Sequence, residues 1–79
     1  MDAKVKELFA AILGEDLKAI DEQTCPASMP RWDSLQHMIL VSSVEEEFGI
    51  DIEPEEAVEM YVNFGVFQKT VLQKIADSL

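Results

Sequence analysis

Apolar side chains recur at helical spacing in this chain, and glycine and proline limit the helices that they predict. In the first stretch they fall at positions i, i+3, i+4 and i+7: Val5, Leu8, Phe9 and Ile12. This spacing predicts an amphipathic helix over residues 3–13. Gly14 is expected to end the helix, because glycine adopts the left-handed conformation at little cost.

Two prolines exclude regular helix from the stretch that follows. Pro26 and Pro30 lie in residues 15–31, where we therefore expect a long loop, with room for a short helical turn near Leu17. Apolar side chains are expected to fasten this loop to the core: Leu17, Ile20 and Met29. Loops of this length are uncommon in compact domains and usually have a function.

A second helix is predicted from Asp33 or Ser34 to about Phe48, where Gly49 ends it. Asp33 and Gln36 have the spacing of a capping box, which leaves Ser34 in the first turn. Apolar residues that repeat every four positions form the core stripe: Leu40, Val44 and Phe48, flanked by His37 and Val41.

The remaining chain predicts two more helices. Residues 50–52 alternate but are too few for a sheet. Pro54 and the acids after it predict a short helix to Met60, since the dipole favours acids in a first turn. Asn63 is expected to cap a last helix through Ile75. The fold class is all-α: a small four-helix bundle with a long loop after the first helix and a short third helix.

Length, composition and charge exclude several classes of protein. Its 79 residues allow a single domain, 1–79, with one modest core, and 48% hydrophobic residues argue against disorder. A net charge of −10 would repel nucleic acid and anionic membranes. Cys25 is the only cysteine, so an intrachain disulfide is excluded. No apolar run approaches the roughly 20 residues of a membrane span, and the first residues do not have the pattern of a signal peptide. We expect a soluble, cytoplasmic protein.

The acids are concentrated in one half of the sequence. No lysine or arginine lies between Arg31 and Lys69, whereas nine acids do: Asp33, Glu45, Glu46, Glu47, Asp51, Glu53, Glu55, Glu56 and Glu59. Three of them, residues 45–47, stand at a predicted helix C-terminus, where the dipole disfavours negative charge. We interpret the acids as a recognition surface for basic partners, with a purely solubilising face as the alternative.

A short motif marks the start of the second predicted helix. Asp33-Ser34-Leu35 resembles the serine attachment motif of acyl carrier proteins, and residues 44–52 are similar to that family's acidic helix end. The resemblance covers essentially the whole chain. It implies the acyl carrier fold and a 4′-phosphopantetheine arm attached to Ser34, which holds acyl groups as thioesters. It also implies that the protein is not itself an enzyme.

The resemblance further implies sites and partners. The residues around the arm would be Asp33, Ser34 and Leu35, and we add Trp32, which stands where many family members have a small residue. The partners would be a phosphopantetheinyl transferase and acyl-loading, condensing or other thioester-handling enzymes with basic patches, acting on a monomer. Their contacts would be Met38, Ile39, Glu45, Glu46, Glu47, Glu55, Glu56 and Glu59. An acyl pocket between the second and third helices would be lined by Leu40, Val44, Phe48, Ile52, Met60 and Val62.

Departures from the family pattern leave alternatives open. Gln36 and Ile39 stand where many fatty-acid carriers have acids, which favours a specialised fatty-acid or polyketide-type pathway. An aminoacyl or peptidyl carrier is the alternative within the same fold, and an unmodified acidic helical adaptor is an alternative of another class. Trp32 either covers the root of the arm or anchors the loop on the core, and we favour anchoring.

Three other features carry weaker hypotheses. His37 follows Ser34 by three residues, as in a nucleophilic pair, but no third orienting residue is evident, so we favour packing beside the core or the base of the arm. The acidic residues 51–62 lack the sixth-position glycine and final glutamate of a calcium loop, and we expect no metal site. We interpret Cys25 as a small packing residue.

Overall fold

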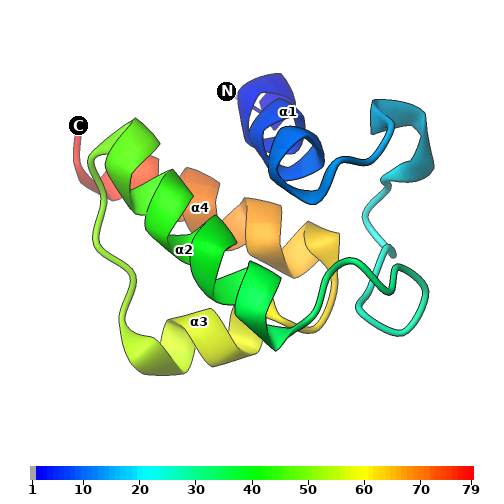
Figure 1. Cartoon of the computed structure of the whole chain (residues 1–79). Coiled ribbons are helices and arrows are strands. Elements are labelled where there is room, and N and C mark those ends of the chain that lie inside the picture. Colours follow the sequence, from blue (N-terminus) through cyan, green and yellow to red (C-terminus); the bar gives the residue numbers. More distant parts are fainter. Residues whose placement is uncertain (1) are drawn as a thin grey trace.

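The computed structural model describes residues 2–79 and consists of helices joined by loops (Figure 1). The elements are α1 (Asp2–Leu13), a 3₁₀ turn (Leu17–Ala19), α2 (Ser34–Phe48), α3 (Pro54–Met60) and α4 (Phe64–Asp77). Within the described residues there is no strand, and no helix is long and apolar enough to cross a bilayer. The predicted all-α class and the order of its helices are confirmed, and α4 extends two residues beyond the predicted end.

Aromatic rings from α1, α4 and the loop before α2 form the centre of the core. Phe9 meets Trp32 edge-on at a centroid distance of 4.9 Å and Phe64 at 4.7 Å. Phe67 is fully buried beside them. Such edge-to-face pairs stabilise a core by about 0.5–1.5 kcal/mol beyond their buried area. The buried apolar faces of α1, α2 and α4 therefore meet around one aromatic cluster.

Glycine ends α1 and α2 as predicted. Gly14 and Gly49 have φ angles of 68° and 64°, in the left-handed region where a side chain would be strained. At the end of α1, the Arg31 guanidinium donates hydrogen bonds to the carbonyls of Leu13 and Gly14, at 3.3 and 2.9 Å. A residue just before the serine motif therefore stabilises the carbonyl end of α1.

The long loop over residues 15–31 stabilises the start of α4. The N–H groups of Phe64 and Gly65 donate to the carbonyls of Thr24 and Glu22, at 2.7 and 2.9 Å. Ile20 and Met29 of this loop are buried, as expected. The prediction for Leu17 is wrong, because this side chain lies in the 3₁₀ turn and is 41% exposed.

The short helix α3 runs back along α2, so that its end lies near the start of α2 (Figure 1). Pro54 occupies its first turn, and the N–H of Glu53 donates to Glu56 Oε1 at 3.0 Å. An ion pair of 2.8 Å between Lys74 Nζ and Glu56 Oε1 joins α3 to α4. Through this placement, α3 contributes residues to the surroundings of the serine motif.

Candidate functional site

Ser34 is the first residue of α2 and is exposed to solvent. Asp33 before it has an extended backbone, and its Oδ1 accepts a hydrogen bond from the N–H of Gln36 at 2.8 Å. This N-cap stops the loop and starts the helix at the serine. Within residues 2–79 the Gln36 side chain makes no return bond, so only half of the predicted capping box is present.

The N–H groups of Ser34 and Leu35 have no hydrogen-bond acceptor among residues 2–79. The first N–H groups of a helix lack intrahelical partners, and the helix dipole places partial positive charge there. The Ser34 hydroxyl therefore lies beside a helix end that favours an anion. The Asp33 carboxylate opposes this preference in part.

Trp32 and His37 form a buried hydrogen bond on either side of the serine. The indole N–H of Trp32 donates to Nδ1 of His37 at 3.0 Å, and His37 Nε2 lies 2.7 Å from the carbonyl oxygen of Ala57 in α3. Because an indole N–H only donates and a carbonyl only accepts, His37 is neutral and carries its proton on Nε2.

The surroundings of His37 resist protonation. Burial lowers the pKa of His37, and the hydrogen bond to the Ala57 carbonyl acts in the opposite direction with a smaller effect. Both ring nitrogens are occupied, so His37 does not take a proton from Ser34, and the nucleophilic pair is contradicted. The expectation that His37 packs beside the core is confirmed, since it is 6% exposed.

Trp32 anchors the loop on the core. Its side chain is 1% exposed and packs against Phe9 and Tyr61. The favoured alternative is therefore confirmed. The inclusion of Trp32 among the residues around the arm stays a prediction, and in the structure its ring lies buried in the core.

Exposed apolar side chains surround the serine on α2. Leu35, Met38 and Ile39 are 65%, 69% and 43% exposed. Met38 and Ile39, which were predicted to contact partners, are therefore accessible from solvent. Val58 of α3 adds another exposed apolar side chain, at 75%. Apolar surface that remains exposed at one place is typical of an interaction site.

Two of the glutamates expected to contact partners are engaged within the protein. Glu45 Oε2 accepts the N–H of Ile52 at 2.9 Å and holds the segment between α2 and α3. Glu56 is paired with Lys74, and the hydrogen bond from Lys74 lowers its pKa. The remaining predicted acids point into solvent: Glu46, Glu47, Glu55 and Glu59. The sequence could not separate these two groups, because their partners come from other elements.

The residues expected to line an acyl pocket are mostly packed in the core. Leu40, Val44 and Met60 are fully buried, Ile52 is 9% exposed and Phe48 is half-buried. Val62 differs from them, since it follows the end of α3 and is 54% exposed.

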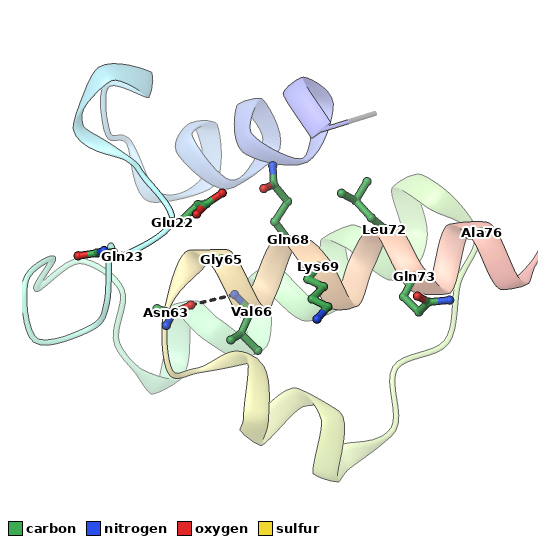
Figure 2. Close-up of a pocket in the computed structure, with 10 residues that line it drawn as sticks. All are labelled: Glu22, Gln23, Asn63, Gly65, Val66, Gln68, Lys69, Leu72, Gln73 and Ala76. Carbon is green, nitrogen blue, oxygen red and sulfur yellow. Dashed lines mark hydrogen bonds between the residues drawn. The ribbon is translucent and has the colours of Figure 1, made fainter.

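A cavity of about 640 Å³ lies elsewhere, between the long loop and α4 (Figure 2). Glu22 and Gln23 form its loop side, and Val66, Lys69 and Gln73 belong to its α4 side. Ser34 and the predicted pocket residues do not line it. This cavity is therefore separate from the serine site.

Comparisons with known proteins agree with this arrangement. The profile of the family described as phosphopantetheine attachment site matches residues 3–65. A search of curated proteins finds no match. Among solved structures, the chain is similar to the holo acyl carrier protein of Geobacter metallireducens, determined by solution NMR. The TM-score is 0.84 and the identity 25%, over 98% of this chain and 87% of that chain.

The fold and the exposed serine at a helix start define a small carrier domain. The chain belongs to the phosphopantetheine attachment family and has the acyl carrier protein fold. Its cofactor is a covalently attached 4′-phosphopantetheine.

Proposed function

We propose that Ser34 bears the 4′-phosphopantetheine and that the chain carries acyl intermediates in a specialised fatty-acid or polyketide-type pathway. When bound, the arm supplies a thiol that holds the acyl group as a thioester. The observation that carries the proposal is the exposed Ser34 hydroxyl beside the open N–H groups of Ser34 and Leu35. A phosphodiester at such a helix end is stabilised by about 0.3–1 kcal/mol.

The residues around Ser34 present it but do not activate it. Ser34 contributes the oxygen of the phosphodiester, and Asp33 fixes the turn from which this oxygen projects. Because both nitrogens of His37 are engaged, the base that removes the hydroxyl proton has to come from the transferase.

The surface of α2 supports a partner with two kinds of contact. Near Ser34 it is apolar, through Leu35, Met38 and Ile39. At its far end it is acidic, through Glu46 and Glu47. A transferase or thioester-handling enzyme with an apolar rim at its active-site entrance and a basic patch beyond it would fit both. The uncharged side chains of Gln36 and Ile39, where many fatty-acid carriers have acids, support specialised enzymes over housekeeping ones.

The attachment site is tested with coenzyme A, Mg²⁺ and a broad-specificity phosphopantetheinyl transferase, followed by intact mass. The wild-type chain is expected to gain one arm, and Ser34→Ala none. Ser42→Ala is the matched control, because Ser42 is an exposed serine on the same helix. No gain in the wild type, or a gain that persists in Ser34→Ala, would contradict the proposal.

The docking surface is tested by charge reversal. The double variant Glu46→Lys, Glu47→Lys is expected to lower kcat/KM for arm transfer by roughly tenfold at low salt, and less at high salt, since rim charges chiefly raise encounter rates. Asp2→Lys with Glu7→Lys makes the same charge change on exposed positions of α1. An equal loss in both double variants would mean that net charge, and not the α2 surface, matters.

A further inference from the structure

We propose that His37 is a positioning residue for arm attachment, whose two ring nitrogens hold the loop that presents Ser34 against α3. This inference rests on the proposal that Ser34 bears the arm. The juxtaposition that carries it is the chain of hydrogen bonds from Trp32 through His37 to Ala57, whose first two members flank Ser34 in the sequence.

On the loop side, every polar group of Trp32 is held. Its backbone N–H donates to the carbonyl of Met29 at 2.9 Å, and its indole N–H donates to His37. Its carbonyl accepts from the Tyr61 hydroxyl at 3.4 Å. Trp32 precedes Ser34 by two residues and is 1% exposed, so these bonds fasten the backbone just before the serine to the core.

On the α3 side, His37 caps the end of a helix. Ala57 lies in the last four residues of α3, whose carbonyls lack partners within the helix, and the N–H of Tyr61 bonds to Val58 instead. The Nε2–H of His37 fills this place at Ala57. The Tyr61 ring also lies 4.8 Å from the imidazole. His37 therefore joins the end of α3 to the first turn of α2.

Among residues 2–79, the groups that contact the His37 ring from the elements packed against it do not include a carboxylate. The preceding loop contributes Trp32, α3 and its C-cap contribute Ala57 and Tyr61, and α4 contributes Phe67. None of these four groups is a carboxylate, so none offers a negative charge to the imidazole.

The acids closest in sequence to this network are also engaged elsewhere. Asp33 binds the N–H of Gln36, and Glu56 binds Lys74. A proton added at Nδ1 would therefore face the donor-only indole N–H and break the bond to Trp32.

Three variants separate positioning from packing. Trp32→Phe keeps an aromatic ring but deletes the indole donor. His37→Leu fills the volume of the imidazole but makes neither hydrogen bond. His37→Gln keeps a donor near Ala57 but has no titrating group. Single-turnover rates of arm transfer are measured with chains that melt above the assay temperature. We expect roughly tenfold slower transfer in Trp32→Phe and His37→Leu, with little change in KM, because a misplaced reacting group costs rate. His37→Gln is expected between them and the wild type.

Two further readouts respond to positioning and not to packing alone. The ratio of wild-type to His37→Gln rates cancels the transferase's own pH profile, and we expect this ratio to fall as the pH is lowered from about 8 to about 5. In an NMR titration, Trp32→Phe is expected to raise the pKa of His37, because Nδ1 then no longer faces an N–H.

Wild-type rates in folded Trp32→Phe and His37→Leu, or a pH-independent ratio, would overturn the inference. A wild-type chain that accepts no arm would instead overturn the proposed function, and this inference with it. Slow transfer confined to the variants supports His37 as a positioning residue.

Discussion

The first turns of α2 and α4 begin with matching caps. Asp33 Oδ1 accepts from the N–H of Gln36 and Asn63 Oδ1 accepts from the N–H of Val66, both at 2.8 Å. In each helix the fourth residue after the cap is an aromatic ring in the core, His37 in α2 and Phe67 in α4. The local chemistry that starts the two helices is therefore the same.

What covers the two helix starts is different. In α4, the N–H groups of Phe64 and Gly65 are taken by carbonyls of the long loop, and Phe64 is buried. An added Cβ on Gly65 would lie 3.0 Å from the Glu22 carbonyl oxygen, so this loop leaves no space. In α2, Ser34 and Leu35 face solvent. The two helix starts therefore share a cap and differ in their cover, and only the uncovered start of α2 leaves its first side chains accessible to a partner.

The largest expected effect contrasts the apolar residues of the two first turns. Phe64→Ala is expected to lower the free energy of unfolding by about 3–5 kcal/mol, because it empties a buried site. Leu35→Ala is expected to change it by less than about 0.5 kcal/mol, because Leu35 is 65% exposed. Urea unfolding followed by circular dichroism measures both. Similar losses would mean that the α2 start is also covered.

A smaller effect contrasts the two caps. Asp33→Ala and Asn63→Ala are each expected to cost about 1 kcal/mol of stability, since each frees one N–H group of a first turn. Arm transfer is expected to slow in Asp33→Ala only, because only that cap orients the serine turn. Asp33→Asn, which retains an acceptor oxygen, is the control and should unfold at nearly the wild-type denaturant concentration. Slower transfer in Asn63→Ala would remove the distinction.

Local sequence patterns were sufficient for the helices and the serine turn. Apolar spacing placed the four helices, Gly14 and Gly49 placed two helix ends, and Asp33 and Asn63 placed two caps. Each of these depends on residues within one or two turns of each other, so the chain order alone contains the information.

Contacts between distant segments were beyond prediction from the sequence. Glu45 and Glu56 looked like free acids, because Ile52 and Lys74 meet them only after the helices pack. The bond from Trp32 to His37 was missed although both residues flank Ser34, since a spacing of five residues does not place side chains on one helical face. The sequence did contain a signal for this bond, because Trp32 offers an N–H donor and His37 an acceptor nitrogen on either side of Ser34.

The smallest expected effect is a loss of stability on acidification, and it concerns His37, the ring that differs between the two helix starts. Burial lowers the pKa of His37 in the folded chain, whereas in the unfolded chain it is near the ordinary value of about 6.5. Between these two pKa values the unfolded chain binds more protons, so this contribution is complete above the ordinary pKa and is lost as the pH falls through the folded one.

The test of this pH effect follows urea midpoints of the wild type and His37→Gln from neutral to acidic pH. Protonation of the acidic side chains is common to both proteins, so the difference between their midpoints isolates the imidazole. We expect the wild type to lose stability relative to His37→Gln on acidification. Parallel midpoints would show that His37 titrates alike in the folded and unfolded chains. The start of α2 would then be as insensitive to protons as the start of α4, where Phe67 occupies the corresponding place.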